Sequence, residues 1–115
     1  MMTKEISLED LKLRLQSATP PILLEALPAK YYDDWHLPGA GHLPHDEVRQ
    51  RAASAVPDRS APIVVYCASD TCRNSHIAAS QLAQLGYADV SVFAGGKKAW
   101  SEAGLPVETG VSQAA

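Results

Sequence analysis

The sequence predicts an α/β domain in which a small, mostly parallel sheet carries helices on both faces. Runs of β-branched and apolar residues alternate along the chain with segments of helical periodicity, and the connections between them are short. A chain of 115 residues can form one domain with its own hydrophobic core. We therefore expect a single domain over residues 1–115, with a core at about 6–107 and a C-terminal tail at 108–115.

The N-terminal part predicts a helix followed by a buried strand. Ser7 can cap the helix, because Asp10 stands three residues later, where a capping-box acid usually lies. Leucines then recur at helical spacing, at Leu8, Leu11 and Leu15. Prolines end this helix, and the apolar run at 22–27 suits a strand that is buried on both faces.

The middle of the chain predicts two helices and a very short strand. The segment at 28–36 opens with a proline, which suits the first turn of a short helix. A turn-rich segment follows and carries a very short strand at 40–43. Residues 45–56 then predict a second main helix, which Pro57 ends.

A strand and a helix flank the two cysteines of the chain. The β-branched run "IVVYC" at 63–67 predicts a strand. The helix after it has Ser75 as its N-cap and Gly86 as its C-terminal stop. Its apolar side is expected to consist of Ile77, Leu82 and Leu85.

The last elements repeat the alternation of strand and helix. Residues 89–93 predict a strand, which a Gly-Gly turn separates from a final helix. Gly104 ends that helix.

The composition excludes some classes of partner. The net charge of −3 gives no electrostatic reason to bind nucleic acid or an anionic membrane. The N-terminus lacks the apolar segment of an export signal, and no window is long and apolar enough to span a membrane. Two cysteines without an export signal indicate a reducing compartment. We predict a cytoplasmic protein with no nucleic-acid partner and no membrane partner.

The loop after Cys67 is the candidate site. In open α/β sheets, ligands bind beyond the carboxyl ends of the strands, and Cys67 occupies that position. A loop that leads into a helix N-terminus presents backbone N–H groups and the positive end of the helix dipole, so it favours an anion. We therefore expect a lowered thiol pKa and a thiolate nucleophile at Cys67. The same loop would hold a persulfide or an oxyanion substrate such as thiosulfate, phosphate or arsenate.

The loop residues differ in what they contribute. Arg73 is the only cation in the loop and could pair with a substrate oxyanion, whereas a carboxylate at Asp70 facing the sulfur would raise the pKa of Cys67. The expected anion-binding loop consists of Ala68, Ser69, Asp70, Thr71, Cys72, Arg73, Asn74 and Ser75.

The two cysteines are also open to structural and metal-binding roles. A cysteine at a strand end is often a small buried hydrophobe, but the strand–loop–helix context favours a chemical role for Cys67. Cys72 is either a resolving or assisting thiol or a bystander. A closed zinc site needs four ligands, and the cysteines lack a second pair. The four histidines do not complete a zinc site with them; these are His36, His42, His45 and His76. We expect no metal and no cofactor.

Three segments support a resemblance to a known family: "HLPGAGHLP", "PIVVYC" and "LAQLGYADVSVFAGGKKAWSEAGLPV". In their order and spacing they resemble single-domain rhodaneses, a sulfurtransferase family, over about residues 8–107. The resemblance implies a five-stranded parallel sheet flanked by helices. It also implies that Cys67 accepts sulfane sulfur from a small donor such as thiosulfate as a persulfide. The sulfur would then pass to cyanide or to a thiol acceptor, which can be a small molecule or a protein.

The sequence departs from the family at several points, among them Trp35 in place of the usual glycine, a missing loop glycine and the added Cys72. The usual Asp-Val-Arg motif reads Glu25-Ala-Leu27, and the loop is longer by two residues, because Ser75 lies eight positions after Cys67. His36 matches a family residue with a structural role, so it is not a catalytic candidate.

The loop departure leaves other functions open. Cys67 to Arg73 reads C-x5-R, which resembles the longer loop of dual-specificity cell-cycle phosphatases and some arsenate reductases. A phosphatase or arsenate reductase is therefore one alternative. A non-catalytic rhodanese-like module that binds a partner or senses redox state is another.

Overall fold

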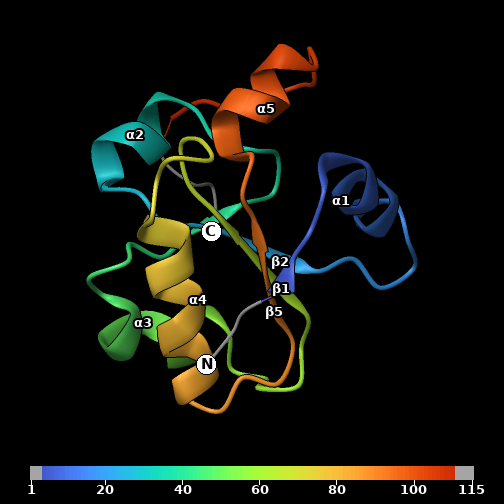
Figure 1. Ribbon diagram of the computed structural model, residues 1–115. Coiled ribbons are helices and arrows are strands. Elements are labelled where there is room, and N and C mark those ends of the chain that lie inside the picture. Colours follow the sequence, from blue (N-terminus) through green and yellow to red (C-terminus); the bar gives the residue numbers. More distant parts are fainter. Residues whose placement is uncertain (1–3, 111–115) are drawn as a thin grey trace.

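The computed structural model describes residues 4–110 and contains a five-stranded, all-parallel sheet with helices on both faces (Figure 1). The predicted fold class is confirmed. The elements are β1 (Lys4–Glu5), α1 (Leu8–Leu15), β2 (Ile22–Glu25), α2 (Ala29–Asp34), β3 (Gly41–His42), α3 (Val48–Ala55), β4 (Ile63–Tyr66), α4 (Asn74–Gln84), β5 (Val90–Phe93) and α5 (Gly96–Glu102).

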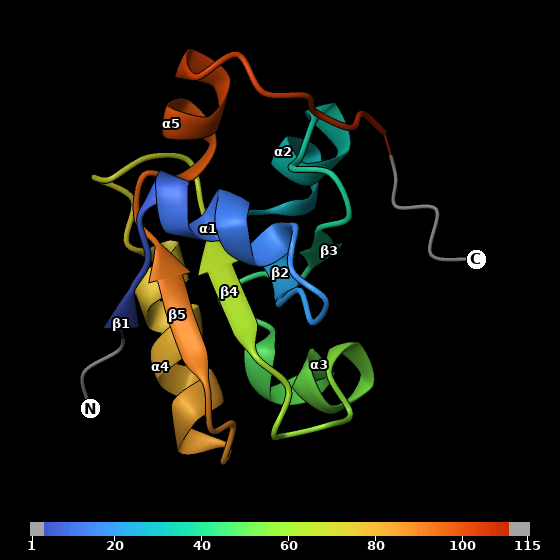
Figure 2. The ribbon, with the colours of Figure 1, turned by 90° about the vertical axis from the view of Figure 1, so that its right-hand side faces the viewer.

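The sheet has the order β1-β5-β4-β2-β3, which places β4 at its centre. All four residues of β4 are buried, because the strand pairs with β2 and β5 and is covered on both faces. Figure 2 shows β4 and β5 pointing toward the end of the molecule that carries α2 and α5. The residue after β4 therefore lies at this end of the sheet.

Alternate strand residues supply two hydrophobic cores. Val65 and Val92 face the first core, which α3 and α4 cover. Val64 and Phe93 face the second core, which also contains Leu11 of α1 and Trp100 of α5. The period-2 alternation of a strand thus serves both faces of the sheet.

Several predicted helix features are confirmed and others are wrong. The hydroxyl of Ser7 accepts a hydrogen bond from the backbone N–H of Asp10 at 3.1 Å, so it caps α1 as expected. The helix α3 begins at Val48, later than predicted, because residues 44–47 form a turn in which the Glu47 N–H donates to the Pro44 carbonyl.

Among the described residues, no helix is long and apolar enough to cross a membrane.

The start and the buried side of α4 differ from the prediction. Arg73, and not Ser75, stands at the N-cap, and Ser75 is buried in the first turn. Ile77 is 41% exposed, which contradicts its assignment to the apolar side. Leu82 is buried as predicted, and Leu85 packs against the core. The remaining buried residues of the helix are Ser75, Ala78 and Ala79. The small side chains of Ser75, Ala78 and Ala79 let α4 lie close to β4 and β5. The Ser75 hydroxyl lies at the Cys67 sulfur, at the start of the loop.

Two features at the chain ends were not predicted from residue patterns. The exposed strand β1 pairs with β5 at the sheet edge. Residues 108–110 also contact the domain, because Glu108 exchanges two backbone hydrogen bonds with His36 and the Gly110 N–H donates to the Asp33 carbonyl. Residues 111–115 of the predicted tail lie outside the described residues.

Candidate active site around Cys67

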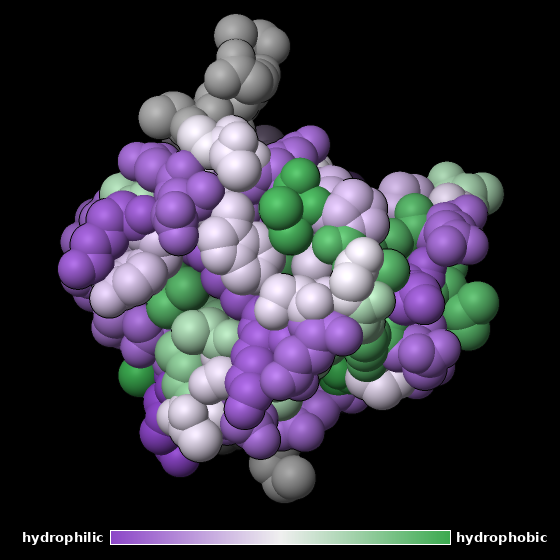
Figure 3. Space-filling model, turned by 90° about the horizontal axis from the view of Figure 1, so that it is seen from above, coloured by the Kyte–Doolittle hydropathy of each residue, from purple (hydrophilic) through white to green (hydrophobic). Residues whose placement is uncertain are grey.

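Cys67 follows β4 directly and is only 1% exposed. Its thiol donates a hydrogen bond to the Cys72 carbonyl oxygen at 3.4 Å, and its sulfur lies 3.3 Å from the Ser75 hydroxyl oxygen. The chain therefore loops out after the strand and returns to cover the sulfur. Figure 3 shows this end of the molecule, where hydrophilic side chains surround small hydrophobic areas.

The loop is shaped by contacts among its own residues. The Cys72 N–H donates to the Ser69 carbonyl at 3.1 Å, and the hydroxyl oxygens of Ser69 and Thr71 lie 3.0 Å apart. Ala68, Asp70, Thr71 and Arg73 are exposed, whereas Asn74 is partly buried at the start of α4. Both cysteines are free thiols, and Cys72 is partly buried.

Burial raises the pKa of the Cys67 thiol, which contradicts the predicted lowering. The neighbouring Cys72 thiol raises this pKa further, whereas the hydrogen bonds from Ser75 lower it. Asp70 is exposed and is not among the groups that shift the Cys67 pKa. The prediction failed because it counted the N–H groups and the helix start but left out the burial of the sulfur, which outweighs the hydrogen bonds from Ser75. The loop also directs the Cys72 carbonyl at the sulfur.

The start of α5 packs closely against the backbone at the beginning of the loop. The N–H of Lys97 donates to the Cys67 carbonyl at 2.9 Å, and that of Lys98 donates to the Ala68 carbonyl at 2.8 Å. Gly96 has φ +59°, and a Cβ atom there would lie 2.3 Å from the Cys67 carbonyl oxygen. The Gly-Gly segment therefore permits a close approach that another residue would prevent.

A buried ion pair lies beside this contact. Glu25, at the end of β2, is 0% exposed, and its Oε2 lies 3.1 Å from the Lys97 Nζ. Its Oε1 accepts a hydrogen bond from the Tyr66 hydroxyl at 2.8 Å. Burial raises the pKa of Glu25, and Tyr66 and Lys97 oppose this effect. Burial and the Glu25 carboxylate also raise the pKa of Tyr66.

The sequence interpretation missed the role of Lys97. Its Nζ also donates to the Tyr31 carbonyl at 2.7 Å and lies 4.9 Å from the centroid of the Trp35 ring. A single charged residue in the otherwise apolar run at 22–27 was the available signal for a buried pair. Its partner was not visible, because Lys97 lies 72 positions after Glu25 in the sequence.

Arg73 does not stand alone beside the loop. It lines a shallow groove of about 390 Å³ between α3 and α4, together with Arg49 and His76. Arg49 donates a hydrogen bond to the Gln84 side-chain oxygen at 2.7 Å. The structure thus groups the loop cation with a second arginine that the sequence interpretation did not select.

The side chains of His36 and His42 have structural partners. The Nδ1 of His36 lies 2.8 Å from the Tyr32 carbonyl oxygen, and its ring stacks on the Tyr32 ring at a centroid distance of 3.9 Å. The Nε2 of His42 lies 2.6 Å from the Leu27 carbonyl oxygen. Within residues 4–110, no group of three or more His, Cys, Asp and Glu side chains could hold a metal ion.

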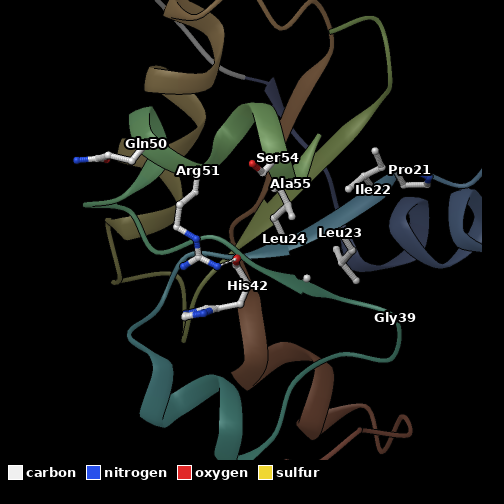
Figure 4. A pocket seen from close by; sticks show the side chains of 11 residues that line it. Pro21, Ile22, Leu23, Leu24, Gly39, His42, Gln50, Arg51, Ser54 and Ala55 are labelled. Carbon is white, nitrogen blue, oxygen red and sulfur yellow. Dashed lines mark hydrogen bonds between the residues drawn. The ribbon is translucent and has the colours of Figure 1, made fainter. Parts of the chain in front are cut away.

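A cavity of about 700 Å³ lies away from the loop, between β2, β3 and α3 (Figure 4). The Arg51 guanidinium extends along it and donates to the His42 carbonyl at 3.3 Å. None of the predicted site residues lines this cavity.

Comparison with known proteins gives one family and several relatives. The model of the rhodanese-like domain family matches residues 7–103. The thiosulfate sulfurtransferase PspE of Escherichia coli K12 is 40% identical over 67 residues. The matched region is 58% of this chain and 62% of that protein, so it spans less than two thirds of the relative.

Solved structures resemble the whole described fold. A rhodanese-like domain from Anabaena is 30% identical with a TM-score of 0.79, and the match covers 99% of this chain and 85% of that one. A thiosulfate sulfurtransferase from Pseudomonas aeruginosa is 25% identical with a TM-score of 0.82. That match covers 96% of this chain but only 21% of the other.

Proposed function

This chain belongs to the rhodanese-like domain family, and we propose that it transfers sulfane sulfur as a persulfide on Cys67. The donor is thiosulfate or a similar small compound, and the acceptor is cyanide, a small thiol or a protein thiol. The observation that carries the proposal is the position of Cys67 at the carboxyl end of β4, with its sulfur 3.3 Å from the Ser75 hydroxyl. The residues of the loop, 68–75, bind the anionic donor. The free thiols suit a reducing compartment such as the cytoplasm.

The proposed reaction has two displacement steps. The Cys67 thiolate attacks the outer sulfur of thiosulfate, the S–S bond of thiosulfate breaks, and sulfite leaves with the bonding electrons. The acceptor then attacks the outer sulfur of the Cys67 persulfide. When the acceptor is cyanide, the product is thiocyanate, and the Cys67 thiolate is released as the leaving group.

Ionisation of Cys67 and opening of the loop are coupled in this mechanism. A protonated thiol donates to the Cys72 carbonyl, whereas a thiolate can only accept, so ionisation removes that hydrogen bond. The Ser75 hydroxyl can then donate to the sulfur. Because Cys67 is only 1% exposed, the loop must move before a donor reaches the sulfur. Backbone N–H groups of the loop and Arg73 would then face the anion.

Cys72 is the proposed resolving thiol. Its side chain is close enough to Cys67 to raise the pKa of that thiol. In this step the Cys72 thiolate attacks the inner sulfur of the Cys67 persulfide and hydrosulfide leaves. A Cys67–Cys72 disulfide forms, which an external thiol must reduce before the next cycle. If the Cys72→Ser variant kept the persulfide lifetime and the turnover with thiol acceptors, this role would be wrong.

Intact mass spectrometry after incubation with thiosulfate tests the proposed function. We expect a mass gain of one sulfur atom in the wild type and in Cys72→Ser, and none in Cys67→Ser. Thiocyanate should form from thiosulfate and cyanide only when Cys67 is present. A stable adduct from phenyl phosphate, with no sulfur adduct, would instead indicate a C-x5-R phosphatase. A Cys67 that forms neither adduct would indicate a non-catalytic module.

A further inference from the structure

Three contacts connect Tyr66 to Cys67 through two buried charged residues, Glu25 and Lys97. The Tyr66 hydroxyl donates to Glu25 Oε1 at 2.8 Å, and Glu25 Oε2 lies 3.1 Å from Lys97 Nζ. The Lys97 backbone N–H donates to the Cys67 carbonyl at 2.9 Å. The peptide bond between Tyr66 and Cys67 closes this circuit. It uses β2, β4 and α5, and it includes none of the loop residues 68–75.

The charges in the circuit are deeply buried and well supported. Glu25 is 0% exposed and Lys97 is 7% exposed. Lys97 Nζ also donates to the Tyr31 carbonyl and lies over the Trp35 ring. The Tyr66 hydroxyl in turn accepts the Leu37 N–H at 3.2 Å. These partners hold both charged side chains in place, because a displacement of either one would break contacts that water cannot replace in the interior.

Lys97 connects the ion pair to the candidate nucleophile within one residue. Its side chain is held by Glu25, and its backbone holds the Cys67 carbonyl. Gly96, just before it, packs so closely on that carbonyl that α5 and Cys67 must move together. The position of the ion pair therefore determines where the first peptide of the loop lies.

We propose that Lys97 is a positioning residue for sulfur transfer, and that its ion pair with Glu25 holds Cys67 in register with the loop. This inference rests on the proposed function. Lys97 acts through its backbone contact and does not touch the reacting sulfur, so it is not a catalytic residue. Loss of the pair displaces the nucleophile from the bound donor, which lowers kcat more than it raises KM for thiosulfate.

The test compares Lys97→Met with Lys30→Met, which makes the same change at an exposed lysine of α2. We expect kcat for thiosulfate and cyanide to fall about 10- to 100-fold in Lys97→Met, with KM for thiosulfate changed less than about threefold. Lys30→Met should match the wild type. Equal kcat in Lys97→Met and Lys30→Met would overturn the proposal, and so would a loss confined to KM.

A double variant separates positioning from folding. Lys97→Met leaves the Glu25 carboxylate buried without a cation, so a loss of folded protein would also lower the activity of that variant. Glu25→Gln/Lys97→Met removes both charges, and we expect it to recover the thermal stability lost in Lys97→Met while kcat stays low. Recovery of kcat together with stability would show that the pair serves folding alone.

A second readout does not depend on sulfur transfer. The rate of Cys67 alkylation by iodoacetamide, located by peptide mapping, reports how firmly the backbone holds the buried thiol. We expect it to rise several-fold in the double variant relative to Lys30→Met. If the wild type transferred no sulfur, the proposed function would fail, whereas equal alkylation rates would refute the positioning role by itself.

Discussion

The sulfur of Cys67 lies 3.3 Å from the hydroxyl oxygen of Ser75, in the first turn of α4. Ser75 is the neighbour that lowers the pKa of this thiol against the effect of burial. The two side chains come from opposite ends of the loop, so this contact closes the loop over the end of the sheet.

Replacing Ser75 should make Cys67 harder to ionise. In Ser75→Ala the pKa of Cys67 rises, because a hydrogen bond to the thiolate is lost. We expect alkylation of Cys67 by iodoacetamide at neutral pH to slow about tenfold, since a hydrogen bond to a charged group contributes about 1.5–3 kcal/mol. Ser80→Ala, on the same helix, serves as the control. An unchanged pH profile of alkylation in Ser75→Ala would contradict this prediction.

The raised pKa of Cys67 makes stability depend on pH. The folded state keeps the thiol proton at a pH where the unfolded chain has lost it, so the free energy of unfolding falls as the pH rises above about 8.5. The raised pKa of Tyr66 acts in the same direction above about pH 10. The free energy of unfolding, measured with urea at several pH values, should decline less with rising pH in Cys67→Ser than in Cys72→Ser. An equal decline with pH in the two variants would refute the assignment to Cys67.

Gly96 and Gly104 offer a matched pair of substitutions. Both have positive φ, but a Cβ at Gly96 would lie 2.3 Å from the Cys67 carbonyl oxygen, whereas one at Gly104 would meet nothing within 4 Å. Gly104→Ala should lower the free energy of unfolding by about 1–2 kcal/mol through backbone strain alone. Gly96→Ala should lower it further and should also reduce sulfur transfer. Similar unfolding curves for the two variants would show that the close contact between Gly96 and the Cys67 carbonyl does not limit the side chain at position 96.

The two arginines in the α3–α4 groove should attract an anionic donor. Arg73→Gln is expected to raise KM for thiosulfate several-fold at low ionic strength, and Arg49→Gln to raise it less, because only Arg73 belongs to the loop. The effect should shrink as salt is added. Arg14→Gln, on α1, is the control, and equal KM values in Arg73→Gln and Arg14→Gln at low salt would contradict a role in donor binding.

Local sequence patterns predicted most of the fold. The alternation of strand and helix indicated a parallel sheet, and the run before Cys67 indicated that this residue follows a strand. Ser7 was recognised as an N-cap because capping depends on residues only three positions apart. The strand β1 was missed, since its two exposed polar residues have no strand pattern and pair only because β5 lies beside them.

Properties of the site that depend on distant residues could not be predicted. Ser75 was expected to cap α4, but the turn of the loop moves the helix start to Asn74 and leaves the Ser75 hydroxyl at the sulfur. The pKa of Cys67 was expected to be lowered, whereas burial by the folded loop raises it. Both errors have one cause, because the path of the loop depends on its packing against the sheet.

The sequence by itself therefore determined the fold class and the place of Cys67 at the end of a strand. Hydrophobic periodicity and helix signals act over a few residues, so they can be read along the chain. Only the tertiary structure decided that Lys97 joins Glu25 and the Cys67 carbonyl. These contacts join residues up to 72 positions apart, so no local pattern reveals them. A buried charge is stable only where the folded chain places a partner of opposite charge beside it.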